Sequence, residues 1–213
     1  MLTVVESLDR IRDRIVSAGG DPERIRVVAV AKGHPPERVQ EALEAGLVDV
    51  GESYAQELVE KADAVDTYVR WHFIGNLQRN KVRHVAPFVH LWQSVDRLSL
   101  AGEIARQAPG ASVLVQVNVS GVEHQGGVAP ERLAAVVEGC GDLGLDVQGL
   151  MAIGPQGPEA VVRAAFGTLR ALADGLGLAE CSMGMSADLE AAVAEGSTML
   201  RIGTALMGPR SSR

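Results

Sequence analysis

The sequence predicts an α/β protein, a single-domain (β/α)8 barrel of the TIM type with one extra helix before its first strand. Short apolar runs alternate with amphipathic segments eight times along the 213 residues. The runs are rich in Val, Ile and Leu, which is typical of parallel strands buried on both faces. Eight strand–helix units favour a closed barrel. The alternative is an open Rossmann-like sheet, but no predicted strand is followed by its G-x-G-x-x-G fingerprint.

Each element can be placed from its pattern. Helical spacing of apolar residues predicts a first helix over 4–18, which the following glycines end. The first strand runs to Lys32, and further strands are expected at 48–51, 70–74, 91–95, 112–119, 147–152, 181–183 and 199–202. Helices are expected at 36–45, 54–65, 80–86, 96–108, 130–139, 158–176 and 188–194, with Asp96 as an N-cap. Residues 1–210 are expected to form the barrel and 211–213 a frayed tail.

Composition excludes several classes of partner. The net charge of -7 is unfavourable for a surface that binds nucleic acid or an anionic membrane. No apolar stretch approaches the ~18 residues of a membrane span, and the acidic, amphipathic N-terminus is not that of a signal peptide. Cys140 and Cys181 are far apart and lack metal-ligand spacing, so reduced thiols are expected. We therefore expect a cytoplasmic protein without a metal, nucleic-acid or membrane partner.

Candidate functional residues lie where the strands end, because function in such barrels collects at the carboxyl ends of the strands. Lys32 ends the first strand, and a lysine there is either solvated or has a specific role. The loops after the seventh and eighth strands contain Gly184, Ser186, Gly203 and Thr204. Glycine amides and hydroxyl groups at these two loops are suited to bind phosphate. For either loop alone, ordinary turn formation is the alternative.

Arg201 is expected to point into the barrel, since it shares one face of its strand with Met199 and Gly203. An inward arginine needs an acceptor, which is either Glu52 in a buried ion pair or an atom of a ligand. A phosphate site, an inward arginine and a strand-end lysine together suit a phosphorylated aldehyde held as a Schiff base. Pyridoxal 5′-phosphate (PLP) meets these requirements.

Several motifs carry a resemblance to a known family over nearly the whole chain. They are V-A-V-A-K ending at Lys32, G-E at 51–52, W-H-F-I-G-x-L-Q-x-N-K at 71–81, G-L-M-A-I at 149–153, M-G-M-S at 183–186, and E-G-S-T-M with R-I-G-T over 195–204. The sequence resembles the pyridoxal phosphate homeostasis protein family, whose fold is that of the alanine racemase N-terminal domain.

The resemblance implies roles for individual residues. Lys32 would carry PLP as a Schiff base, Ser186, Gly203 and Thr204 would hold its phosphate, and Arg201 would face the pyridine nitrogen. Further expected cofactor contacts within the matching motifs are Ser53, His72 and Met185. For His72, the alternative to a cofactor contact is a structural role as a core histidine. Ser53 stands where the family usually has asparagine. Gln125 replaces a lysine that the family usually carries before Gly126. The other histidines, His34, His84, His90 and His124, are expected to be solvated.

Two functions remain open, a PLP carrier without turnover and a PLP-dependent amino-acid racemase. Racemisation needs one acid/base group on each face of the cofactor. Racemases of this fold supply the second group from a further domain. An arginine at the pyridine nitrogen would weaken the electron sink, and a barrel mouth without a lid would suit exchange of the cofactor. We therefore expect a non-enzymatic, monomeric PLP carrier, with PLP-dependent apo-enzymes as candidate recipients.

Overall fold

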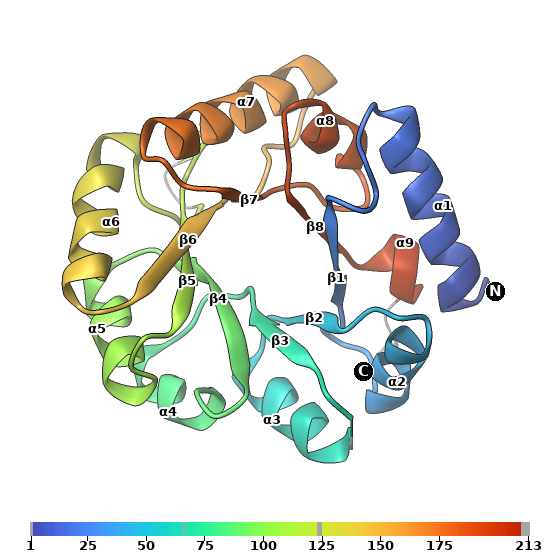
Figure 1. The fold of residues 1–213 in the computed structure, drawn as a ribbon, viewed down its shortest axis with the longest axis horizontal. Helices are drawn as coiled ribbons and strands as arrows, with labels where there is room; N and C mark the ends of the chain where they lie inside the picture. Colours follow the sequence, from blue (N-terminus) through green and yellow to red (C-terminus); the bar gives the residue numbers. More distant parts are fainter. Residues whose placement is uncertain (1, 66, 123–124, 210–213) are drawn as a thin grey trace.

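The eight predicted apolar runs form eight parallel strands that close into a barrel, with helices around the outside (Figure 1). The computed structural model describes residues 2–65, 67–122 and 125–209. The strands are β1 (Arg26–Val30), β2 (Asp49–Glu52), β3 (Arg70–Phe73), β4 (Val89–Val95), β5 (Ser112–Gln116), β6 (Asp146–Met151), β7 (Glu180–Ser182) and β8 (Met199–Ile202). Each strand pairs with the next, and β8 pairs with β1, so the predicted fold class is confirmed. The predicted tail at 211–213 and His124 lie outside the described residues.

The helices follow the strands in the predicted alternation. They are α1 (Val4–Ser17), α2 (Pro36–Glu44), α3 (Ala55–Ala64), α4 (Val82–Val85), α5 (Leu98–Gln107), α6 (Leu133–Asp142), α7 (Glu159–Gly175), α8 (Leu189–Ala194) and α9 (Thr204–Met207). Two 3-10 turns, η1 (Arg79–Lys81) and η2 (Pro130–Arg132), precede α4 and α6. The extra helix α1 begins with a capping box between Thr3 and Glu6 and lies beside α8 and α9 (Figure 1). No helix in the described ranges has both the length and the apolar character needed to cross a bilayer.

Two local expectations were wrong. The fifth strand ends at Gln116 and not at residue 119. Beyond it, Val117 forms a bridge to Val128, and the amide of Asn118 donates to the Val128 carbonyl at 2.9 Å. Asp96 is not an N-cap. Its carboxylate instead accepts a hydrogen bond from the guanidinium of Arg97, and α5 starts one residue later without a side-chain cap.

Side chains alternate between the inside of the barrel and the layer under the helices. The interior holds an apolar cluster from five strands, made of Val28, Leu91, Leu114, Met151 and Met199. Val27 and Ala29 of β1 and Leu200 and Ile202 of β8 belong instead to the larger core that includes the helices. This two-residue period makes Lys32 and Arg201 inward-facing positions, as predicted for Arg201.

A row of polar side chains also crosses the barrel interior. His72 is fully buried, and its Nε2 donates to Asp49 Oδ1 at 2.8 Å. Its Nδ1 accepts from Gln93 Nε2 at 2.7 Å, and Gln93 Oε1 in turn accepts from Ser182 Oγ at 2.7 Å. The side chains of β2, β3, β4 and β7 are thereby joined, and each buried polar atom of the row has a partner.

Burial lowers the pKa of His72, although the hydrogen bond and the charge of Asp49 oppose this shift. The unfolded chain therefore takes up a proton on His72, below about pH 6.5, that the folded chain excludes. Folding stability is expected to fall as the pH drops from about 6.5 toward the lowered pKa, with a slope of up to about 1.4 kcal/mol per pH unit from this group. Urea unfolding at several pH values should show this slope reduced in His72→Gln and unchanged in His84→Gln, which alters an exposed ring. Equal slopes for wild type and His72→Gln would contradict the assignment.

Candidate functional site

Lys32 lies just beyond the carboxyl end of β1, at a cavity of about 240 Å³ in the mouth of the barrel. Residues from the ends of six strands, β1, β2, β3, β6, β7 and β8, line this cavity. They are Val30, Lys32, His34, Ser53, Ile74, Ile153, Met185, Ser186, Ala187, Arg201, Gly203 and Thr204. The structure thus brings together every predicted cofactor residue except His72, which lies deeper in the barrel.

Arg201 is the charged group at the base of the cavity. Its Nη1 donates to the carbonyl and the hydroxyl of Ser182, both at 2.7 Å, and its Nη2 donates to the Ala152 carbonyl at 2.8 Å. Burial lowers the pKa of Arg201 to about 10. In the described part of the chain the guanidinium forms no ion pair with a carboxylate. The hydrogen bonds of the buried cation go to carbonyl and hydroxyl groups, and the charge of Asp188 opposes the lowering of its pKa. An acceptor on a ligand would be stabilised beside it.

Of the two alternatives for the acceptor of Arg201, the ion pair with Glu52 does not form. Glu52 lies on the outward face of β2, where its carboxylate meets α3, whereas Arg201 points inward from β8. The alternation of each strand places the two charges on opposite sides of the sheet.

His72 reaches the site only through other residues. Ser182 accepts a hydrogen bond from Arg201 and donates one to Gln93, which bonds to His72. His72 is thus a core histidine two residues removed from Arg201, and the structure does not bring it to the cavity wall. The row of polar groups it belongs to fixes the position of Ser182 and hence of the guanidinium.

The loops after β7 and β8 face each other across the cavity. Ser186 Oγ accepts from the amide of Ala205 at 3.2 Å, which joins the first loop to the start of α9. Gly203 occupies the N-cap position of α9, beside Thr204. Gly184 has a φ of +95°, and a Cβ there would lie 2.4 Å from Ala192 Cβ, so only glycine permits this turn. Amides and hydroxyl groups converge here as an anion site requires.

The extra helix supports one of these loops. Arg14 of α1 makes a two-pronged ion pair with Glu190 at 2.6 and 2.7 Å, and it also donates to the Ser186 carbonyl at 3.1 Å. The helix that precedes the barrel therefore contributes to the position of the Ser186 loop.

A buried ion cluster holds the turns that carry Lys32 and Ser53. Lys61 of α3 is 4% exposed and donates to Glu52 at 2.5 Å, Glu57 at 2.9 Å and the Ala31 carbonyl at 2.7 Å. Glu57 accepts from the Gly33 amide at 2.8 Å. Burial raises the pKa of Glu52, although Lys61 and two backbone amides oppose this shift. The sequence analysis missed this cluster, although the spacing of Glu57 and Lys61 on one helix face could have indicated it.

His34 was also missed. It was expected to be solvated, but it is 7% exposed and lines the cavity, so that expectation was wrong. The turn after Lys32, in which the His34 amide donates to the Ala31 carbonyl at 3.0 Å, folds the side chain back toward the barrel. His84 and His90 are exposed, as expected.

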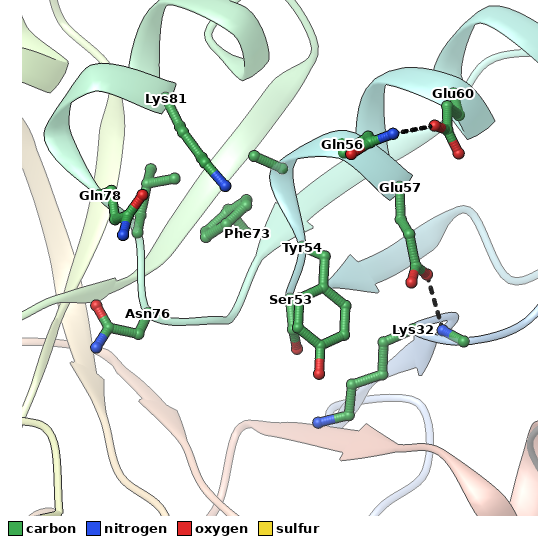
Figure 2. Close-up of a pocket in the computed structure, with 13 residues that line it drawn as sticks. Lys32, Ser53, Tyr54, Gln56, Glu57, Glu60, Phe73, Asn76, Gln78 and Lys81 are labelled. Carbon is green, nitrogen blue, oxygen red and sulfur yellow. Dashed lines mark hydrogen bonds between the residues drawn. The ribbon is translucent and has the colours of Figure 1, made fainter. Parts of the chain in front are cut away.

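A second, larger cleft adjoins the cavity at Lys32 and Ser53. It has a volume of about 730 Å³ and lies between the start of α3 and the segment that follows β3 (Figure 2). The residues that line it are Lys32, Gly33, Ser53, Tyr54, Ala55, Gln56, Glu57, Glu60, Phe73, Asn76, Leu77, Gln78 and Lys81. No group of three or more potential metal ligands occurs in the ranges that the structure describes.

Comparisons with known proteins identify relatives of this chain. The family model described as alanine racemase, N-terminal domain, matches residues 7–211. Proteins called pyridoxal phosphate homeostasis protein are similar along almost their entire length. The one from Pseudomonas aeruginosa is 45% identical, with 99% of this chain and 97% of the relative covered, and the one from Aquifex aeolicus is 41% identical, with 95% of each covered. The solved structure of PipY from Synechococcus elongatus with PLP bound has a TM-score of 0.82 and 33% identity, and covers 93% of this chain and 100% of its own.

The fold and the site together define a single-barrel protein of the alanine racemase N-terminal class. The chain belongs, within that class, to the pyridoxal phosphate homeostasis protein family.

The ion cluster around Lys61 leads to a stability prediction. Lys61→Met leaves two buried carboxylates without their cation, so the free energy of unfolding is expected to fall by about 3–5 kcal/mol. Lys81→Met, which removes an exposed lysine, is expected to change it by less than about 0.5 kcal/mol. Chemical denaturation of both variants measures the difference. A Lys61→Met variant as stable as the wild type would mean that the cluster contributes no net stability.

Proposed function

We propose that this protein binds PLP as a Schiff base on Lys32 and serves PLP homeostasis without turning over a substrate. The observation that carries this proposal is the shared cavity, in which Lys32, Arg201 and the two hydroxyl-bearing loops meet. The names of the relatives and the PLP-bound PipY structure support it. The residues present fit the group, because a buried guanidinium that bonds to no carboxylate in the described ranges lies at the same opening as a primary amine and an anion-type cradle.

Each residue has a role in the proposed binding. PLP, when bound, supplies an aldehyde that condenses with a primary amine and releases one water molecule. Lys32 provides that amine. Ser186, Gly203 and Thr204 bind the phosphate through hydroxyl and amide groups at the start of α9. Arg201 faces the pyridine nitrogen, where its positive charge disfavours protonation of the ring.

Ser53 and Met185 complete the walls of the proposed binding site. A serine in place of the family's usual asparagine leaves more room beside Lys32, on the side where the larger cleft begins.

A racemase is the second candidate, and one observation favours testing it. Tyr54, which the sequence analysis gave no role, lines the cleft and extends over Lys32 in Figure 2. A phenol in that position could serve as the second acid/base group that racemisation needs. The carrier proposal is supported instead by Arg201, because a cation at the pyridine nitrogen weakens the electron sink that racemisation uses.

The remaining parts of the proposal concern the setting of the protein. We propose a cytoplasmic monomer, with residues 1–210 as the PLP-binding domain and PLP-dependent apo-enzymes as recipients. Cys140 and Cys181 support a reducing compartment, because both are free and buried, and burial raises the pKa of each thiol to about 11.

Loading of PLP tests the site directly. Incubation with PLP followed by borohydride should attach one cofactor to the peptide that contains Lys32, detected by mass spectrometry. Lys32→Ala should lose both this adduct and the imine absorbance. Ser186→Ala should weaken PLP binding by about tenfold or more, because a charge-assisted hydrogen bond is lost. Ser99→Ala, at an exposed serine of α5, is the matched control. An undiminished imine chromophore in Lys32→Ala would refute the assignment of Lys32.

Hydrogen exchange in deuterium oxide separates the carrier from the racemase. The PLP-loaded protein is expected to exchange the α-hydrogen of alanine no faster than free PLP does, as followed by NMR. Exchange at an enzyme-like rate that disappears in Tyr54→Phe would establish the racemase instead.

A further inference from the structure

The cleft beside the cavity carries an unassigned arrangement of charge. Its floor is shared with the cavity at Lys32 and Ser53, so a molecule in the cleft lies next to the Lys32 amine. Its volume of about 730 Å³ lies within the range of small-molecule sites. Nothing in the binding of PLP proposed above uses the far walls of this cleft.

One wall supplies donors for an anion. Asn76, Gln78 and Lys81, from the segment after β3, are exposed and line the cleft. Figure 2 shows the Lys81 ammonium group directed into the space between the walls. In the described ranges Lys81 forms no ion pair. One ammonium group and two side-chain amides suit a carboxylate.

The opposite wall is acidic. Glu57 is fixed by the Gly33 amide and by Lys61, and Glu60 is exposed and accepts from Gln56 at 2.8 Å. A cation is favoured on this side and a doubly charged anion is disfavoured. The cleft thus has one wall with an ammonium group and two amides and an opposite wall with the exposed carboxylate of Glu60, with Lys32 at its floor.

The sequence concentrates its lysines here. Of the 20 Lys and Arg residues, three are lysines, namely Lys32, Lys61 and Lys81. Two of them line the cleft, and the third holds Glu57 in its wall. Every other basic residue among these 20 is an arginine, so the lysines of the sequence all belong to this region of the barrel.

We infer that the cleft binds a zwitterionic primary amine of the α-amino-acid class, which displaces Lys32 and carries PLP away. This inference rests on the proposed function. The incoming nitrogen forms a bond to the imine carbon, and the bond from that carbon to Lys32 Nζ breaks. The hydrogens that the incoming ammonium group loses on becoming an imine nitrogen end on Lys32 Nζ, which becomes a free ammonium group, so the exchange needs neither oxidant nor reductant. Lys81 is a positioning residue that binds the carboxylate.

The experiment compares two amines on the PLP-loaded protein. L-alanine carries the carboxylate and ethylamine does not. PLP released into an ultrafiltrate is measured against amine concentration, and loss of the protein-bound chromophore is followed in parallel. In Lys81→Gln the concentration of L-alanine that releases half of the PLP should rise about tenfold, with the ethylamine value unchanged. The value for each amine is compared between the wild type and the variants, so the difference in basicity between the two amines does not affect the result.

Two variants serve as controls. Lys81→Arg keeps the charge and should restore release by L-alanine. Arg83→Gln removes a charge from α4, outside the cleft, and should behave as the wild type. Equal L-alanine curves for wild type and Lys81→Gln would overturn the inference but leave PLP loading intact. Failure of the wild type to load PLP on Lys32 would overturn the proposed function as well.

Discussion

The two-residue alternation of the barrel strands is the constraint on which the rest of this structure depends. It sends Met199 and Arg201 into the barrel and Leu200 and Ile202 toward the helices. The same rule puts Glu52 outside, where α3 supplies Lys61 as its partner. Because the two charged groups fall on opposite sides of the sheet, Arg201 does not pair with Glu52 and bonds to carbonyl and hydroxyl groups of the barrel instead, so its charge is available to a ligand in the barrel mouth.

Two buried networks then hold the site from different directions. The ion cluster of Lys61 acts from the helix layer and fixes the turns after β1 and β2 through Ala31, Gly33 and Ser53. The polar row from Asp49 to Ser182 acts from inside the barrel and fixes Arg201. Both networks are expensive to bury and depend on complete pairing, so each restricts the site to one geometry.

The fold and most of the cavity could be predicted from the sequence because they depend on local patterns. The periodicity of the strands predicts the barrel, which the structure has. The positions of the strand ends predict that Lys32, Ser186 and Gly203 lie at one opening, and all three line the cavity. Two errors concern contacts that periodicity does not encode, because the burial of His34 and the end of the fifth strand at Gln116 depend on how loops fold back over the barrel. The ion pair of Arg201 with Glu52, by contrast, is excluded by the alternation along β2 and β8. Helix capping at Asp96 failed because a neighbouring arginine competes for the same carboxylate.

The placement of the three lysines has a chemical consequence for the protein itself. Aldehydes condense with amines that can lose their proton, and a guanidinium group does not do so near neutral pH. A chain that carries its surface charge on arginine therefore offers a reactive aldehyde few competing side chains. Lys61 is buried in its ion cluster, and Lys81 stands at the same opening as Lys32. The surface of the protein therefore has few side chains that react with the aldehyde of PLP. This limits unwanted modification of the protein while the cofactor enters and leaves.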